Sequence, residues 1–261
     1  MRRKVALITG AATGIGKRTA IELAKEQYNI AITYVHSREE SEELVRLLGQ
    51  EYGIEACCFK SDASIEQDCI DAVKAIEERF GGIDIFIHNA GPYIHERKPM
   101  ADYSPEEFRY IMDGNLGSFF YMSKLILPYM RSQKWGRIVT FGFERSETAP
   151  AWQDRSIFAA AKSGLTSLTR TLAKEEAPNG ITVNMVCPGD ITPEWKESEL
   201  QDAESTEDPA TPVGRPGTGG DISRVVAFLC KEESGFITGS VIPVTGGKEV
   251  LSKSMQKSES C

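Results

Sequence analysis

The chain has 261 residues, of which 41% are apolar and 26% are charged. These values are ordinary for globular proteins and exclude a mainly disordered chain. The length allows one large α/β domain whose core needs no disulfide or structural metal. The formal net charge of −8 repels phosphate backbones, so we expect no nucleic-acid partner.

Cysteine spacing and apolar runs exclude two further classes of protein. The six cysteines form no C-x-x-C pair, and the three histidines are not spaced from them as metal ligands, so we expect reduced thiols and no metal site. No apolar run approaches the ~18 residues that a membrane helix needs. The basic start of the chain precedes only a short apolar run, too short for a secretory signal. We therefore expect a cytoplasmic protein with no membrane partner.

Short apolar runs and helical stripes alternate almost from end to end of the chain. The apolar runs, which predict buried strands, cover 5–9, 29–35, 54–60, 83–88, 138–141, 181–186 and 241–244. Helical patterns cover 14–27, 38–52, 64–80, 105–133 and 156–177. Apolar strands separated by helices predict an α/β fold in one domain, with a doubly wound, Rossmann-type parallel sheet of about seven strands.

Two helix starts and one long polar segment stand out in this pattern. Ser64, with Gln67 three residues later, predicts a capping box. Ser104 before Pro105 and two glutamates predicts a second, stronger helix start. The acidic, proline-containing segment at about 189–220 is too long for a turn, and such segments are often functional lids. We expect one domain over 1–247 that includes this lid, followed by a polar tail over 248–261.

A glycine-rich loop joins the first strand to the first helix. Gly10, Gly14 and Gly16 allow a tight turn and let a pyrophosphate approach the backbone, and the helix start supplies free N–H groups. Glycines in such a spacing can also form a plain turn. Their place between a strand and a helix, at the start of a βαβ pattern, is the context of a dinucleotide site.

The loop sequence T-G-x-x-x-G-I-G is similar to the signature of the short-chain dehydrogenase/reductase family. Other family motifs are resembled at 88–91 (N-N-A-G), 113–116 (the helix asparagine), 183–189 (V-N-x-V-x-P-G), and 238–239 with 244–247 (T-G…V-x-G-G). The resemblance extends over residues 4–247. Segments 214–216 and 221–223 make the chain most similar to 3-oxoacyl-acyl-carrier-protein reductases.

The resemblance implies a nicotinamide dinucleotide as cofactor and assigns a place to each contact. Pyrophosphate contacts would come from the loop residues Gly10, Thr13, Gly14, Ile15 and Gly16. Adenine and adenosine-ribose contacts would come from Asp62, Ala63, Asn89, Ala90 and Gly91. Around the nicotinamide and its ribose, the implied residues are Lys162, Pro188, Gly189, Ile191 and Thr192.

The end of the second strand indicates which dinucleotide is used. An acid there accepts hydrogen bonds from the ribose 2′-hydroxyl and repels a 2′-phosphate. This chain has His36, Ser37 and Arg38 at that place, with no acid before Glu39. The three side chains could donate to a phosphate, so we expect NADP(H); the alternative is that Arg38 only begins a solvated helix face.

The family reduces carbonyls with a Tyr-x-x-x-Lys pair, a serine and an asparagine, in which the lysine lowers the phenol pKa and the phenol donates a proton. This chain has Lys162 and Asn115, but Phe158 at the tyrosine position. Aligning 137–142 with the family's fifth strand puts Phe143 at the serine position. Because 143–158 is about two residues longer than in typical relatives, the nearest alternative serine is Ser146. Loop side chains that could replace the missing acid are Tyr93, His95, Ser146 and Asp154.

Two functions fit these residues. The first is an NADPH-dependent oxidoreductase, similar to 3-oxoacyl-thioester reductases, that reduces a small carbonyl compound, free or linked to an acyl carrier protein, at an atypical site. The second is a nucleotide-binding family member with little activity, serving as a sensor or partner subunit. Phe143 and Phe158 favour the second, whereas Lys162, Asn115 and the family resemblance favour the first. The resemblance also implies a homo-oligomer, a tetramer, paired through the helices 105–133 and 156–177.

Overall fold

The computed structural model describes residues 2–249 and 251. The part of the predicted tail that falls on 250 and 252–261 lies outside the described residues. The chain forms one α/β domain around a seven-stranded parallel sheet, in the order β3-β2-β1-β4-β5-β6-β7. The predicted doubly wound sheet is therefore confirmed. The strands are β1 (Val5–Ile8), β2 (Asn29–Tyr34), β3 (Ala56–Lys60), β4 (Ile85–His88), β5 (Gly136–Phe141), β6 (Ile181–Pro188) and β7 (Val241–Val244).

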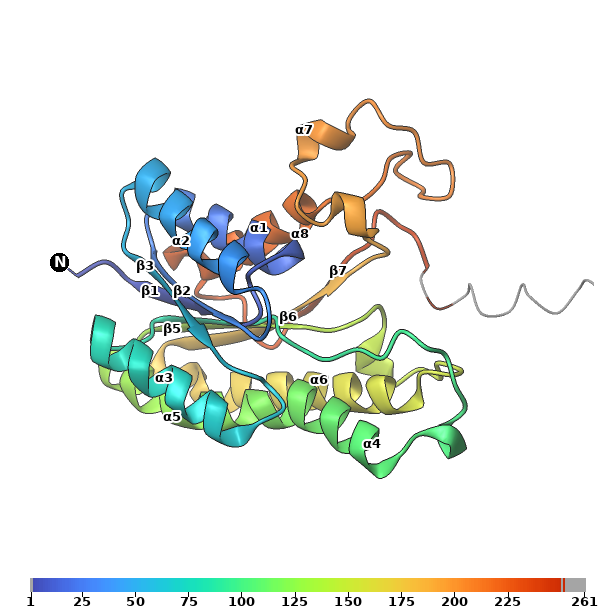
Figure 1. Cartoon of the computed structure of the whole chain (residues 1–261), viewed down its shortest axis with the longest axis horizontal. Coiled ribbons are helices and arrows are strands. Elements are labelled where there is room, and N and C mark those ends of the chain that lie inside the picture. The colour runs from blue at the N-terminus through green and yellow to red at the C-terminus, as the bar shows by residue number, and fades with distance from the viewer. Residues whose placement is uncertain (1, 250, 252–261) are drawn as a thin grey trace, which may run out of the picture.

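Helices cover both faces of the sheet (Figure 1). One layer holds α1 (Gly14–Lys25), α2 (Arg38–Tyr52) and α8 (Gly219–Cys230); the other holds α3 (Glu66–Phe80), α4 (Pro105–Met112), α5 (Ser118–Gln133) and α6 (Ser156–Glu176). Each layer buries its own apolar core against the sheet, for example Leu23 and Val226 on the first face and Phe119 and Leu165 on the second. No helix among the described residues combines the length and the apolar character that crossing a membrane requires.

The two predicted helix starts have different outcomes. The capping box at Ser104 is confirmed: the Ser104 N–H donates to the Glu107 carboxylate over 2.8 Å, and the Glu107 N–H donates to the Ser104 hydroxyl over 3.2 Å. The capping box at Ser64 is wrong, because α3 begins at Glu66 after an uncapped Ile65. The Ser64 hydroxyl and N–H both donate to Asp62, over 2.7 and 2.9 Å. This Asx-type turn after β3 takes up the groups that would have capped the helix.

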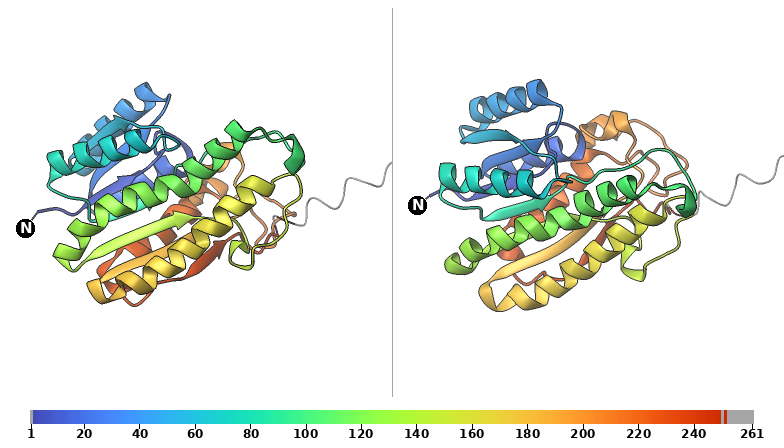
Figure 2. Two further views of the ribbon diagram at one scale, coloured as in Figure 1. Left: turned by 90° about the horizontal axis from the view of Figure 1, so that it is seen from below. Right: turned by 60° about the horizontal axis from the view of Figure 1, so that its bottom comes forward.

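The predicted helix over 105–133 is interrupted at its centre. A π-helical turn, Asp113–Gly117, separates α4 from α5 and carries the buried Asn115. Such turns within α-helices are rare and are frequent at functional sites. In Figure 2, α5 and α6 run side by side below the sheet, so Asn115 and Lys162 are carried by neighbouring helices.

The parallel strands all end at one edge of the sheet. Strand order reverses between β1 and β4, and ligands of doubly wound sheets bind in the crevice at such a switch point. The loops after β1, β4, β5 and β6 meet there. The predicted lid follows β6 and contains the short helices η5 (Pro193–Trp195) and α7 (Leu200–Ala203) before α8 begins. In Figure 1 it rises beyond the carboxyl end of the sheet.

Candidate active site

The glycine-rich loop after β1 packs directly under the segment that follows β4. The Asn89 amide donates to the carbonyls of Thr9 and Gly10, over 2.9 and 3.0 Å. The Thr9 hydroxyl in turn accepts the N–H groups of Asn89 and Ala90, over 3.0 and 2.9 Å. A Cβ on Gly16 would lie 2.7 Å from the Asn89 amide nitrogen. The structure thus brings together two of the segments that the sequence predicts for a dinucleotide.

A lid carboxylate occupies the exposed end of this loop. Glu197 accepts the Gly14 N–H over 2.8 Å with one oxygen, and the Lys17 ammonium lies 2.8 Å from the other. Gly14 has φ +63°, a left-handed conformation that suits glycine and directs this N–H outward. Partial burial raises the pKa of Glu197, but its bonds to Lys17 and Gly14 lower it further, so the net pKa lies below the usual value. An anionic group thus sits at the helix start where a phosphate is predicted to bind.

Asn115 and Lys162 converge beneath Gly91. A Cβ at Gly91 would lie 2.3 Å from Asn115 Oδ1 and 3.3 Å from Lys162 Nζ, so only glycine fits there. The Asn115 amide donates to the carbonyls of Pro92 and Ile111, each over 2.9 Å, while its Oδ1 atom is buried without a hydrogen-bond partner. An unpaired buried oxygen beside an ammonium is costly. The pair is therefore arranged to bind a polar group that donates and accepts hydrogen bonds.

Burial shifts the pKa values of two bases at this point. Lys162 is 5% exposed, and loss of water around its ammonium lowers its pKa to about 8. The His88 ring is fully buried, with Nε2 2.7 Å from the Ser118 hydroxyl. Burial, together with the positive charge of Lys162, lowers the pKa of His88 to about 3. Near neutral pH, therefore, His88 is neutral and only part of the Lys162 population is neutral.

A cavity of about 550 Å³ opens above these residues. The site residues predicted from the sequence that line it are Ile15, Asn89, Gly91, Phe158, Lys162, Pro188, Gly189 and Ile191. It is also lined by charged side chains on two loops, among them Arg97, Glu144, Asp190 and Lys196. Its volume lies in the range of small-molecule sites, which run from about 300 to 1,000 Å³.

Four aromatic side chains form one wall of the cavity, and we call Tyr93, Phe143, Trp152 and Phe158 the aromatic wall. Phe158 meets Tyr93 edge to face at 4.9 Å between ring centroids and Trp152 at 6.1 Å. Phe143 and Trp152 are 5.0 Å apart. Lys162 Nζ lies 5.7 Å from the centre of the Phe158 ring. Offset and edge contacts of this kind are favourable for aromatic rings.

The alternatives for the serine position are separated by the structure. Phe143 lines the cavity, whereas Ser146 is buried outside its lining, 2.9 Å from the Thr166 hydroxyl and close to the sulfur atoms of Met185 and Cys187. Among the other candidate donors, Tyr93 and His95 line the cavity. Asp154 lies outside this lining, and its carbonyl accepts the Lys98 N–H over 3.4 Å.

The remaining predicted cofactor residues lie outside the cavity lining. Exposed His36 and Arg38 flank half-buried Ser37 after β2, and the Arg38 guanidinium lies 2.7 Å from the Glu42 carboxylate. Asp62 and Ala63 follow β3 at the same edge of the sheet. The same is true of Gly10, Thr13, Gly14, Gly16, Ala90 and Thr192, of which Thr192 is exposed and precedes η5. In the described part of the chain, no three His, Cys, Asp or Glu side chains are grouped to hold a metal.

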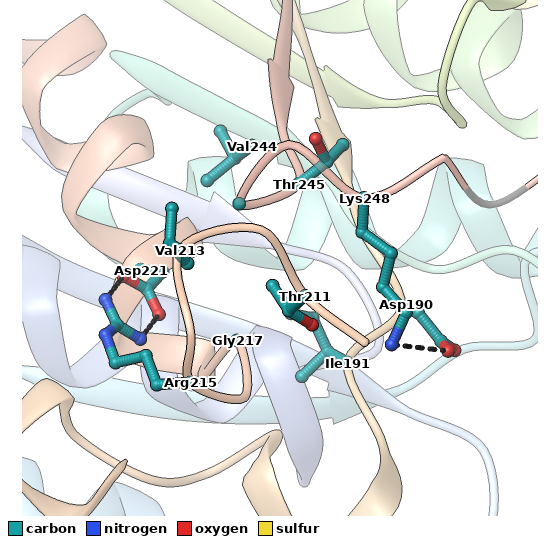
Figure 3. A pocket seen from close by; sticks show the side chains of 11 residues that line it. Asp190, Ile191, Thr211, Val213, Arg215, Gly217, Asp221, Val244, Thr245 and Lys248 are labelled. Carbon is teal, nitrogen blue, oxygen red and sulfur yellow. Dashed lines mark hydrogen bonds and ion pairs between the residues drawn. The ribbon is translucent and has the colours of Figure 1, made fainter. Parts of the chain in front are cut away.

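A smaller cavity of about 170 Å³ lies under the returning limb of the lid (Figure 3) and shares Asp190 and Ile191 with the larger one. Arg215 pairs with Asp221 at the start of α8 over 2.7 Å, and Lys248 lies 3.7 Å from Asp190. These ion pairs tie the lid to α8 and to the chain after β7.

The most informative site residues that sequence reasoning missed are Glu197, Trp152 and Arg155. Arg155 is buried and donates to the carbonyls of Ile94 and His95, over 3.0 and 2.6 Å, so it fixes the loop that carries Tyr93. The position of Trp152 after β5 offered a signal for the aromatic wall. No sequence pattern connects Glu197 to Gly14.

Comparison with known proteins agrees with this fold and site. Residues 10–249 match the family model described as "Enoyl-(Acyl carrier protein) reductase". The chain is 44% identical over 257 residues to "Putative oxidoreductase YtkK" of Bacillus subtilis (strain 168), covering 95% of this chain and 97% of that protein. A solved structure, "Structure of putative 3-oxoacyl-reductase from bacillus thuringiensis", is 40% identical with a TM-score of 0.88, covering 95% and 99% of the two chains.

A further solved structure, of a blue fluorescent protein from a metagenomic library in complex with NADPH, is 28% identical with a TM-score of 0.82 over 94% of this chain and 98% of that one. The chain belongs to the short-chain dehydrogenase/reductase family. It is an oxidoreductase of that family, related to 3-oxoacyl reductases.

Proposed function

We propose that this protein is an NADP(H)-dependent reductase of a carbonyl compound. The observation that carries the proposal is the convergence of Gly91, Asn115 and Lys162, where an unpaired buried oxygen and a buried ammonium meet at the edge of the cavity. These groups suit the ribose hydroxyls of a nicotinamide nucleotide. The Glu197 carboxylate on Gly14 and Lys17 is a stand-in anion that supports phosphate binding at the loop.

The residues that would hold the dinucleotide follow from this placement. The loop from Gly10 to Gly16 would bind the pyrophosphate, Asp62 and Ala63 the adenine, and the segment 89–91 the adenosine ribose. Pro188, Gly189 and Ile191 would flank the nicotinamide, with Thr192 near its carboxamide. The bound cofactor would supply a hydride, while Lys162 and Asn115 would orient the ribose at the floor of the cavity.

NADP(H) is proposed over NAD(H) because His36, Ser37 and Arg38 provide possible donors at the end of β2. The solved NADPH complex of a relative agrees with this preference. We expect NADPH to bind about tenfold more tightly than NADH, since a hydrogen bond to a charged group contributes about 1.5–3 kcal/mol. Equal or reversed dissociation constants would overturn the preference. Arg38→Glu should remove it, whereas Arg109→Glu, exposed on α4, should leave it unchanged.

Phe158 and Phe143 would stand where the family has tyrosine and serine. A phenyl ring cannot donate a proton, and loss of a positioned acid costs about 10²–10⁴ in rate. We therefore expect slow reduction of ordinary ketones and of 3-oxoacyl thioesters, whether carried by coenzyme A or by an acyl carrier protein. NADPH oxidation measured over a panel of carbonyl compounds tests this expectation.

The second candidate function, nucleotide binding with little turnover, is favoured by the same two phenylalanines. Saturable NADPH binding with no turnover of any carbonyl would select it. Such a protein would serve as a sensor or as a partner subunit. Turnover of at least one carbonyl class by the wild-type chain would exclude it.

We also propose a homotetramer located in the cytoplasm. Phe120 on α5 is 55% exposed beside a groove of about 340 Å³ between α5 and α6, lined by Leu127, Leu168 and Leu172 among others. Exposed aromatic patches of this kind mark protein interfaces. Sedimentation at micromolar concentration should give a multiple of one chain. Phe120→Asp should lower the assembled mass, whereas Ile65→Asp on an unrelated surface should not.

A further inference from the structure

The aromatic wall changes which carbonyl the site can reduce. Its four rings come from the loop after β4, the loop after β5 and the start of α6, and they contact one another at 4.9–6.1 Å. Two of them, Phe143 and Phe158, fill the positions where proton-donating and hydrogen-bonding hydroxyls are expected. The wall therefore presents ring faces and edges next to Lys162, where the family arrangement would present acids.

The chemistry of the product decides how serious this loss is. Hydride transfer to an isolated ketone produces an alkoxide, whose parent alcohol is about as weak an acid as water, with a pKa of ~15.7. Such an oxygen has to be protonated as the hydride arrives. Hydride transfer to a quinone produces a phenolate, and a phenol such as that of tyrosine has a pKa of ~10. This anion is almost six powers of ten less basic, so it can leave the protonation to water.

We propose, on the basis of the reductase function above, that the substrate class is a planar quinone bound against the aromatic wall. The quinone takes up a hydride at one oxygen, forming an O–H bond, and the electron pair moves through the ring to the opposite oxygen. The hydride and its two electrons come from the dihydronicotinamide, which leaves oxidised. Lys162 stabilises the phenolate, and a proton from water completes the hydroquinone.

Three observations support a flat, uncharged substrate with an anionic product. The cavity of about 550 Å³ accommodates a bicyclic ring beside a nicotinamide. The wall offers offset stacking to an electron-poor ring. Arg155 already covers the Tyr93 ring at 4.8 Å, and Lys162 lies beside Phe158, so a cationic substrate would meet positive charge on the wall.

The experiment compares 2-methyl-1,4-naphthoquinone with acetoacetyl-CoA as substrates of the full-length protein, with the uncatalysed NADPH–quinone rate subtracted. Wild type should show a kcat/KM at least 10²-fold higher for the quinone. Phe158→Tyr should raise the acetoacetyl-CoA value by about 10²-fold and change the quinone value by less than threefold. Equal wild-type values, or acetoacetyl-CoA reduction that Tyr93→Phe abolishes, would overturn the proposal, the latter because Tyr93 would then be the acid.

Binding provides a readout that is independent of turnover. Without NADPH, equilibrium dialysis of the naphthoquinone should give a dissociation constant that Trp152→Ala raises about 3- to 10-fold, the equivalent of one aromatic contact. Trp135→Phe, beside Lys4 at the opposite end of β5, is the matched control and should leave it unchanged. An unchanged constant in Trp152→Ala would contradict stacking on the wall.

Failure of this proposal can be told apart from failure of the reductase function. NADPH binding with reduction of acetoacetyl-CoA alone would overturn the quinone and keep the reductase. NADPH binding with no turnover of either compound would overturn both and select the nucleotide-binding alternative. Absence of NADPH binding would overturn the dinucleotide site itself.

Discussion

Glu197 Oε1 accepts the backbone N–H of Gly14 over 2.8 Å, so a side chain of the lid occupies the group that is proposed to bind a phosphate. Lys17 holds the second oxygen, and neighbouring Glu199 pairs with buried Arg18 over 2.7 Å. The lid is thus fastened to the start of α1 in the absence of a dinucleotide. Binding has to displace this carboxylate, which makes Glu197 a competitor of the cofactor.

Glu197→Gln should therefore bind NADPH about fivefold to tenfold more tightly than wild type, because charge-assisted bonds that oppose binding are weakened. Titration of intrinsic fluorescence with NADPH measures the change. Glu194→Gln, an exposed carboxylate in the same lid, is the control and should leave the dissociation constant unchanged. A weaker NADPH complex in Glu197→Gln would mean that this carboxylate supports the bound state instead.

Lys162 makes the stability of the dinucleotide-free protein depend on alkaline pH. Its pKa is lowered to about 8 from a usual 10.5, so between these values the unfolded chain binds more protons than the folded one, and stability rises with pH. Relative to Lys162→Met, the wild-type free energy of unfolding should increase by about 3 kcal/mol from pH 7 to 10.5. Urea unfolding at several pH values tests this; parallel curves for the two proteins would contradict it.

His88 has the corresponding effect in acid. Its pKa is lowered to about 3 from 6.5, so the unfolded chain binds the extra proton first as the pH falls, and stability decreases below pH 6.5. Down to pH 4.5, wild type should lose about 2–3 kcal/mol more than His88→Asn. Urea midpoints of both proteins at pH 7.5 and 4.5 measure the difference. If the two proteins lose the same stability, the buried ring does not account for the acid sensitivity.

Most of the fold could be predicted because it depends on local patterns. Apolar runs and helical stripes determine the parallel sheet, and the capping residues of Ser104 act within one turn. Ser64 misled because Asp62, two residues earlier, competes for the same hydroxyl. The π-helical turn at Asn115 could not be predicted, since nothing in local propensity distinguishes it from a continuous helix.

The candidate site was predictable where a motif carries it and was not predictable where only tertiary packing does. Gly91, Asn115 and Lys162 come from separate motifs and meet at one point. The choice between Phe143 and Ser146 required the structure, because the extra loop residues allow two alignments. The contact of Glu197 with Gly14 joins residues far apart in the sequence through a lid without a recognisable pattern.

The proposal that this is a reductase site from which the acid is missing has one direct test, which is kcat/KM for acetoacetyl-CoA with NADPH in wild type, Phe158→Tyr and Phe158→Tyr/Phe143→Ser. The first substitution adds one hydroxyl within reach of Lys162, so we predict a rise of about 10²-fold. The double variant should rise further, by an amount that is not additive, because both hydroxyls act on the same oxygen. Fast wild-type turnover that Phe158→Tyr leaves unchanged or lowers would contradict the account, because the protein would then use a different acid.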